Sequence, residues 1–379
     1  MAEAEPLPEL DRIEGAPHPR ETPRLYGHAA AEAAFLEAFA GGRLHHGWLL
    51  AGPRGVGKAT LAWRMARFLL AQPAPGADAG LFGAPPPPES LDLPADHPVA
   101  RQVAALSHPG LKLIRRTHDE KNRPRQVITV DEVRGLAAFF GLSSIDAGRR
   151  VVIVDAADEL NANAANALLK LLEEPPEGAV LLLVAHQPSQ LLPTIRSRCR
   201  TLRLNPLAPD DLTPALAQAL GEAPPPEEAE ALAALAGGSV GEAVRMATAG
   251  GPALYAEILA LIGAMPGMPR PALNALADST AARGNEARFD MLLRLLEVAL
   301  ARMARCGATG RAPEPVAAPG EGAVLAKMAP DAQAARTWAA LAATLAARAR
   351  SARAVNLDPA ALVVDIFLQM EQAARDLAR

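Results

Sequence analysis

Cysteine is almost absent from this chain of 379 residues, which contains only Cys199 and Cys306. Two cysteines cannot form a four-cysteine zinc site, and their wide separation in the sequence disfavours a disulfide in a reducing compartment. Aromatic residues make up 3% of the chain although hydrophobic residues make up 50%, a balance typical of helices rich in Ala and Leu. Neither an uninterrupted apolar run of about 18 residues nor a signal peptide is found, which predicts a cytoplasmic protein that has no membrane partner.

An excess of positive charge is also missing. The formal net charge is −4, which argues against a strong free-standing DNA-binding protein but leaves a local basic patch possible. The length is too great for one ordinary core, so we expect two or three domains.

A glycine-rich loop provides the first chemical signal. Gly52, Gly55, Gly57 and Lys58 have the spacing of a phosphate-binding loop, in which backbone N–H groups wrap an anion and the lysine reaches the outer phosphates. The flanks fit this interpretation, because Gly47–Ala51 is an apolar run typical of a buried strand and Thr60–Ala71 has helical spacing of its apolar residues. The alternative is a chance glycine-rich turn.

The groups that would bind metal and activate water are incomplete. The hydroxyl that normally follows the lysine is replaced by Ala59, and Thr60 is turned about 100° away on a helix. Asp155 ends a β-branched run at the position of a metal-side carboxylate, but Ala156 follows where nucleotide hydrolases often carry a water-activating Glu. Taken alone, Asp155 would more often be a solvated strand end or a helix cap; the phosphate loop that precedes it in the sequence favours the metal-side position. We therefore expect no bound metal.

Strands alternate with helices up to about Pro206. Four further strands are predicted: Leu111–Ile114 (buried), Val127–Val130, Arg150–Asp155 and Ala179–Ala185. A helix that two prolines stop is predicted over residues 161–174. Asp131 is predicted to cap a helix after the second of these strands. Such alternation implies an α/β fold with a parallel sheet, whereas the rest of the chain is predicted to be helical. The proline-rich residues 72–97 are predicted to be a poorly ordered insertion, and the N-terminus a loose tail.

Four motifs occur in the order found in clamp-loader ATPases of the AAA+ superfamily, which this sequence resembles. They are Gly52–Lys58, Val151–Asp158, Asn166–Pro176 and the segment from Leu192 to Cys199, which contains Ser197-Arg198-Cys199. The resemblance is to a non-motor subunit of the clamp loader of bacterial DNA polymerase III, and it covers residues 25–249 with specific motifs.

The resemblance implies a RecA-like AAA+ parallel-sheet domain followed by a helical lid and an all-α C-terminal collar domain. The corresponding boundaries are a flexible tail at 1–24, the AAA+ domain at 25–205 with its insertion at 72–97, the lid at 206–249 and the collar at 250–379. The collar is the region through which such subunits oligomerise.

The resemblance also implies roles for particular residues. Arg198 is the arginine finger presented in trans to a nucleotide held by a neighbouring subunit. Gly241 stands where hydrolysing relatives carry a lid arginine, so no cofactor is expected to be required. Binding of ATP or ADP is expected to be weak or vestigial. The residues that would bind it are Gly52, Gly55, Gly57, Lys58, Thr60 and Asp155. The four-cysteine zinc module of many relatives has no cysteine here, so no zinc is expected.

The expected partners are the other subunits of a heteropentameric clamp loader and, through that complex, a sliding clamp and primed DNA. The chain alone is not expected to be an enzyme, although it would be a component of a DNA polymerase holoenzyme. The alternatives are an active AAA+ ATPase motor and another AAA+ scaffold of DNA replication or recombination. Subunit stoichiometry, direct DNA contacts, the role of His186 and that of the insertion are left open by the sequence.

Overall fold

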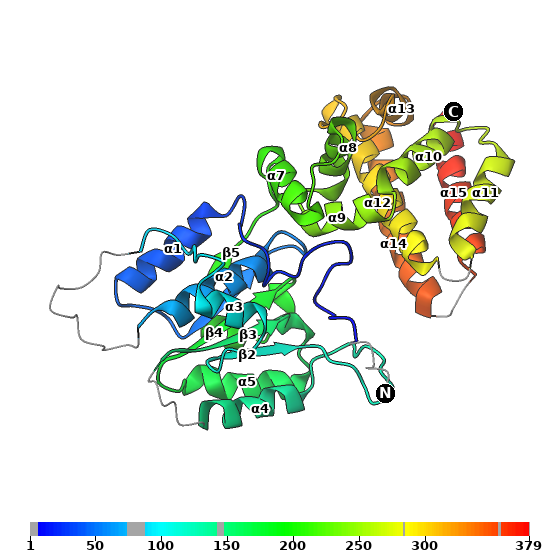
Figure 1. Ribbon diagram of the computed structural model, residues 1–379. Helices are drawn as coiled ribbons and strands as arrows, with labels where there is room; N and C mark the ends of the chain where they lie inside the picture. The colour runs from blue at the N-terminus through cyan, green and yellow to red at the C-terminus, as the bar shows by residue number, and fades with distance from the viewer. Residues whose placement is uncertain (1–6, 74–87, 142–147, 283–284, 355–357, 379) are drawn as a thin grey trace, which may run out of the picture. The chain divides into compact units, whose positions relative to one another are not determined.

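Five parallel strands form one sheet in the order β2-β3-β4-β1-β5 (Figure 1). This computed structural model describes residues 7–73, 88–141, 148–282, 285–354 and 358–378. The strands are β1 (Gly47–Ala51), β2 (Leu111–Arg115), β3 (Arg150–Asp155), β4 (Ala179–Ala185) and β5 (Arg200–Arg203). Every residue of β1 and β4 is buried, as expected for inner strands of a parallel sheet whose two faces are both covered.

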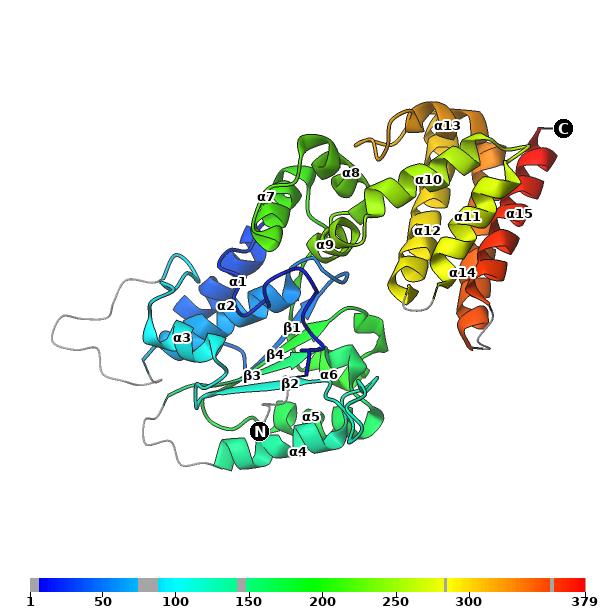
Figure 2. The same cartoon turned by 45° about the vertical axis from the view of Figure 1, so that its right-hand side comes forward.

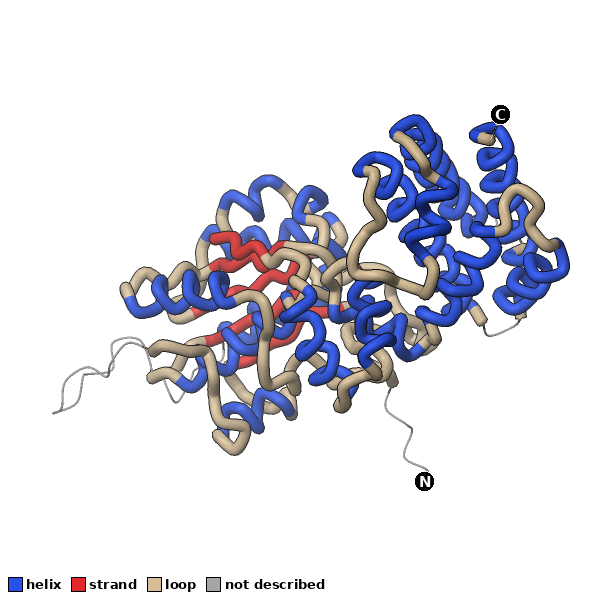
Figure 3. Tube along the Cα trace, turned by 90° about the horizontal axis from the view of Figure 1, so that it is seen from above, coloured by secondary structure: helices blue, strands red, loops and turns tan. Residues whose placement is uncertain are grey.

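Helices cover both faces of this sheet. Figures 1 and 2 place α4 and α5 on one face and α1, α2 and α3 on the other, and Figure 3 shows the strands enclosed between helices. Leu136 of α4 and Leu168 of α5 share a buried cluster with Leu183 of β4. On the other face Phe35 packs edge-on against Trp48 of β1, with ring centroids 5.1 Å apart. The helices and short 3-10 turns of this part are α1 (Ala29–Ala40), α2 (Lys58–Ala71), α3 (Pro98–Ala104), α4 (Val130–Gly141), η1 (Ala157–Glu159), α5 (Ala162–Glu173), η2 (Pro188–Gln190), α6 (Pro193–Ser197) and α7 (Pro209–Leu220).

The predicted α/β fold class is confirmed, but three local predictions are wrong. The run Val127–Val130 is not a strand: Ile128 forms only an isolated bridge, and α4 already begins at Val130. Asp131 consequently lies inside the first turn of α4 and does not precede it. The strand β2 exists, but it is an edge strand in which only Ile114 is buried.

Residues 7–24 have a defined place, which corrects the expectation of a loose tail for this stretch; residues 1–6 lie outside the described part. His18 is fully buried, and its Nε2 lies 3.1 Å from a carboxylate oxygen of Asp11. Arg67 of α2 donates to the Arg20 carbonyl at 2.6 Å, and Arg64 donates to the Pro23 carbonyl at 2.7 Å. The prolines suggested disorder, but backbone carbonyls of the segment accept hydrogen bonds from the two arginines of α2, and these bonds fix its position.

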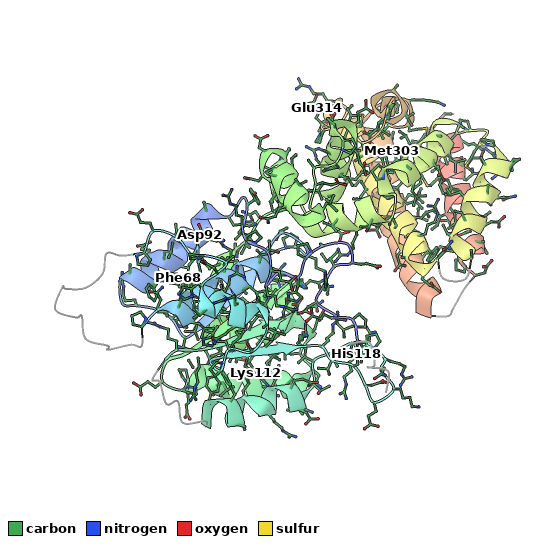
Figure 4. All side chains as sticks on the ribbon, viewed as in Figure 1. Phe68, Asp92, Lys112, His118, Met303 and Glu314 are labelled. Carbon is green, nitrogen blue, oxygen red and sulfur yellow. The ribbon has the colours of Figure 1, made fainter. Side chains whose placement is uncertain are left out.

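The predicted insertion is described only in part, because residues 74–87 lie outside the described residues. Leu91 is buried, and Asp92, labelled in Figure 4, pairs with Arg64 of α2 at 2.9 Å. The described end of the insertion is therefore packed against α2. Lys112 on β2 and His118 in the loop after it are labelled in the same view.

The chain divides into two compact units, the first comprising Met1–Glu222 with Gly238–Gly241 and the second Ala223–Gly237 with Glu242–Arg379. The described residues after β5 are helical or loop, as predicted. No single described helix is long and apolar enough to cross a membrane, and α9 with α10 would meet that test only as a bent pair. The later helices are α8 (Pro226–Ala236), α9 (Val240–Thr248), α10 (Gly251–Gly263), α11 (Arg270–Ala281), α12 (Glu286–Thr309), α13 (Glu321–Met328), α14 (Ala332–Ala354) and α15 (Pro359–Leu377).

The second unit has its own apolar core and a buried ion pair. The long helices α12 and α14 lie side by side (Figures 1 and 2), and Trp338 and Phe367 are fully buried. Arg302 of α12 and Glu321 of α13 pair at 2.6 Å; Arg302 directly precedes Met303, which Figure 4 labels. The Tyr255 hydroxyl of α10 donates to the same carboxylate at 2.7 Å, so one buried charge ties three helices together.

Candidate functional site

The glycine-rich loop lies between the end of β1 and the start of α2. Gly57, the residue before α2, has φ +106°, a conformation that residues with a Cβ rarely adopt. Gly52 approaches another backbone: a Cβ there would lie 2.1 Å from the Leu204 carbonyl oxygen. Its N–H donates to the Ala185 carbonyl at the end of β4. The geometry of the loop therefore requires glycine at positions 52 and 57. The loop has the predicted setting between a strand and a helix.

Lys58 is turned back onto its own loop. Its ammonium donates to the Gly52 carbonyl at 2.7 Å and also to the Pro53 carbonyl, and the side chain is only 3% exposed. Burial lowers the pKa of Lys58 to about 8, partly offset by the negative charges of Asp155 and Asp158. The ammonium that would reach a phosphate is thus already satisfied by backbone oxygens.

The carboxylates after β3 have distinct environments. Desolvation, together with the charges of Asp11 and Glu159, raises the pKa of Asp155 to about 7. Asp158 accepts hydrogen bonds from the backbone N–H groups of His186 and Gln187, at 3.1 and 2.9 Å. Since those bonds fix the segment after β4, Asp158 serves to position the chain. Among the described residues, no group of three His, Cys, Asp or Glu side chains is placed to hold a metal ion.

Glu159 holds the phosphate loop from outside. It pairs with Arg54 of that loop at 2.8 Å and with Arg116, just past β2, also at 2.8 Å. The sequence did not reveal this bridge, because Arg54 and Glu159 are 105 residues apart and no local pattern joins them.

Residues 238–241 and the N-terminal segment lie against the same loop. The Ser239 hydroxyl donates to the Arg54 carbonyl at 2.9 Å, and the Gly241 N–H donates to the Gly55 carbonyl at 3.0 Å. A Cβ on Gly241 would lie 2.9 Å from both the Gly55 Cα and the Ile13 Cδ1. The position assigned to a lid arginine in relatives therefore has no room for a longer side chain here, and Ile13 was not predicted to be near it.

Two other predicted positions lie near this loop. Thr60 is in the first turn of α2 and is half-buried. His186 follows β4, and its Nδ1 is a buried ring nitrogen with no hydrogen-bond partner among the described residues. Burial and the positive charges of Lys58 and Arg54 lower the pKa of His186 to about 4. The imidazole is therefore neutral at physiological pH.

Arg198 lies at the opposite end of the sheet. It follows α6 and precedes β5, which runs parallel to β1 with Trp48 beside Arg200. Its carbonyl oxygen would lie 3.1 Å from a Cβ on Gly47, the first residue of β1. The phosphate loop begins after the last residue of β1, so the five-residue strand separates the two sites by about 16 Å, at about 3.3 Å per residue.

The Arg198 side chain is partly exposed and oriented by two acceptors. It is 37% exposed and pairs through Nη2 with Glu173 at 2.8 Å, while Nη1 donates to the Thr194 carbonyl at 3.1 Å. The structure thus brings together Gly52, Gly55, Gly57, Lys58 and Asp155, with Thr60 in the first turn of α2, and keeps Arg198 away from them.

A parallel sheet of this order, with the phosphate loop after β1 and an acidic strand end on β3, defines an AAA+ type of P-loop domain. Residues 27–208 match the family model described as DNA polymerase III, delta subunit. The resemblance to the delta-prime subunit of the bacterial clamp loader is confirmed.

Several known proteins are similar to this chain. The DNA polymerase III subunit delta' of Pseudomonas aeruginosa is 41% identical over 204 residues, which are 52% of this chain and 55% of that protein. The subunit delta' of Bacillus subtilis is 32% identical, covering 44% of each protein. The gamma/tau subunit of Mycobacterium bovis is 30% identical over 53% of this chain and 31% of its own length. The chain spans about half the length of the delta' relatives.

A solved structure of a DNA polymerase III gamma subunit-related protein from Thermotoga maritima is also similar. It has a TM-score of 0.37 and 17% identity, and the alignment covers 90% of this chain and 99% of that one.

Proposed function

We propose that this chain is a non-hydrolysing subunit of the clamp loader of DNA polymerase III, and that it supplies Arg198 in trans to ATP held by a neighbouring subunit. The observation that carries the proposal is the placement of Arg198 at the end of the sheet opposite its own phosphate loop. The strand β1 separates the Arg198 backbone from that loop by about 16 Å, and the guanidinium is turned onto Glu173 and the Thr194 carbonyl, so it is not placed to act on a nucleotide bound there. Presented to another subunit, it would stabilise the charge that develops on the transferred phosphate.

The state of the chain's own nucleotide site supports the non-hydrolysing half of the proposal. Ala59 provides no hydroxyl for Mg²⁺ and Ala156 no carboxylate to activate water. Lys58 already bonds loop carbonyls, and Gly55 is packed against Ser239 and Gly241. Backbone N–H groups of the loop and Lys58 would be the groups that hold a nucleotide phosphate. ATP or ADP would therefore bind weakly or not at all, and we propose that no cofactor and no zinc is required.

The proposed partners follow from the relatives, which are named as delta' and gamma/tau subunits of DNA polymerase III. We place the chain in a heteropentamer with delta-type and tau/gamma-type subunits, reaching the sliding clamp and primed DNA through that complex. In this role the chain is part of a polymerase holoenzyme and carries no polymerase site of its own.

The second candidate is an active ATPase motor. The retained glycines and Lys58 favour it, as does the 30% identity to a gamma/tau subunit. ATP turnover by the isolated chain would support the motor and exclude the non-hydrolysing role.

The test is the DNA-stimulated ATPase of a reconstituted loader that contains either the wild-type chain or Arg198→Ala. We expect the variant to assemble and to lose roughly 10-fold or more of kcat, since removal of an arginine finger can cost as much as about 10³–10⁵-fold. Arg196→Ala is the matched control, because Arg196 is exposed and only two residues away. Unchanged activity of the Arg198→Ala complex would contradict the proposal.

A further inference from the structure

The Arg198 guanidinium is held by a fixed carboxylate, and the proposed function does not account for this contact. Glu173 is the last residue of α5, and its Oε1 lies 2.8 Å from Arg198 Nη2. The Thr194 carbonyl accepts from Nη1 at 3.1 Å. These two contacts use two of the N–H donors of the guanidinium and leave the others, Nε–H among them, available to a phosphate.

The end of α5 that presents Glu173 is itself anchored. His46 Nε2–H donates to the Leu172 carbonyl at 3.0 Å, and the Leu172 side chain is buried against the start of β1. The Glu174 N–H closes the last turn by donating to the Lys170 carbonyl, and Pro175 prevents the helix from continuing. The backbone of Glu173 is therefore fixed independently of Arg198.

Glu173 and Arg198 are both partly exposed, at 43% and 37% of the side chain. An ion pair this exposed adds little to folding stability, so stability alone gives a weak reason for it. It does limit the rotamers of a long, flexible side chain, and rigid placement of a charged group is what transition-state stabilisation requires.

We propose that Glu173 is a positioning residue that holds the Arg198 guanidinium in the orientation in which it meets the neighbouring subunit's phosphate. This inference rests on the proposed function, since it assumes that Arg198 acts in trans. Glu173 does not touch the nucleotide. Its removal should slow the chemical step through loss of orientation and leave ATP binding by the motor subunit unchanged.

The experiment compares four forms of this chain in the reconstituted complex: wild type, Glu173→Gln, Arg198→Ala and the double variant. Glu173→Gln keeps the shape and one acceptor oxygen but removes the charge. We expect kcat of the DNA-stimulated ATPase to fall about 3- to 10-fold while KM for ATP stays within about twofold. The double variant should be no slower than Arg198→Ala alone, because Glu173 has nothing left to position.

Two further variants separate positioning from a general effect of charge. Glu174→Gln removes the neighbouring exposed carboxylate, which has no ion pair among the described residues, and should leave kcat unchanged. Glu173→Asp keeps the charge on a shorter side chain and should retain more activity than Glu173→Gln.

The outcomes distinguish this inference from the proposed function. If Arg198→Ala lowers kcat but Glu173→Gln does not, Glu173 has no positioning role and the arginine finger stands. If Glu173→Gln raises kcat, or the double variant is slower than Arg198→Ala, the positioning role is likewise overturned. If Arg198→Ala itself has no effect, the proposed function fails first.

Discussion

Removal of the Glu321 carboxylate should destabilise the helical unit severely. Glu321 is 1% exposed and accepts hydrogen bonds from Arg302 Nε and Nη2 at 2.6 and 2.8 Å, and from the Ala317 N–H at 2.8 Å. The Tyr255 hydroxyl also donates to it. In Glu321→Ala the Arg302 charge stays buried without its partner, which typically costs about 3–5 kcal/mol of unfolding free energy. For a unit of this size that corresponds to a fall in Tm of roughly 6–20 °C.

The measurement is urea and thermal unfolding of the full chain followed by circular dichroism. Glu297→Ala in α12 is the control, because its pair with Arg294 is exposed and the two side chains are 3.5 Å apart. That variant should lose no more than about 0.5 kcal/mol. Replacing both partners with apolar residues, as Arg302→Met with Glu321→Leu, should cost less than Glu321→Ala alone. A loss below about 1 kcal/mol for Glu321→Ala would refute the reasoning, since it would mean that Arg302 readily finds water.

Two predictions concern the nucleotide site. We expect the Kd for MgATP to exceed 1 mM, so MgATP at 1 mM should stabilise the chain by at most about 0.4 kcal/mol and raise its Tm by less than about 2 °C. Differential scanning fluorimetry measures this shift. A larger rise that is abolished in Lys58→Ala would contradict the prediction. Because the pKa of Asp155 is raised to about 7, the folded state binds more protons than the unfolded state between about pH 4 and 7, so this group lowers stability as pH rises through that window. Asp155→Asn should therefore be more stable than wild type at pH 8, by at least about 1 kcal/mol, and the difference should shrink near pH 4 in denaturant titrations; equal stability at both pH values would refute the assignment.

Strong local patterns made most of the sheet predictable from the sequence. The sequences of β1 and β4 and the four inner residues of β3 are apolar without interruption, because both faces of a parallel sheet are covered by helices. The edge strand β5 was missed because only Leu202 of its four residues is buried, so it has no apolar run. The β-rich Val127–Val130 misled for the opposite reason: Glu132 accepts from the Thr129 N–H at 3.0 Å, which starts a helix where the residue preferences favour a strand.

The candidate site was predictable only where its residues are neighbours in the sequence. The loop from Gly52 to Lys58 has a local spacing that shows its chemistry. The bridges that hold the loop are non-local: Glu159 reaches Arg54, and Ser239 reaches the Arg54 carbonyl across 185 residues. A single sequence contains no signal for such pairs. The N-terminal segment was misread for the same reason, since prolines describe the local backbone and not the arginines of α2 that bind it.

The two ends of this sheet carry different functional demands. At the end with the phosphate loop, the backbone carbonyls of Gly52 and Pro53 accept hydrogen bonds from Lys58, the group that would reach a phosphate. At the other end Arg198 remains partly exposed, and its contacts with Glu173 and Thr194 orient it without burying it. A partly exposed, oriented guanidinium contributes little to the stability of its own chain. Under the proposed function, a subunit that completes a neighbour's site without hydrolysing ATP itself would need an oriented cation at one end of the sheet and no nucleotide chemistry at the other.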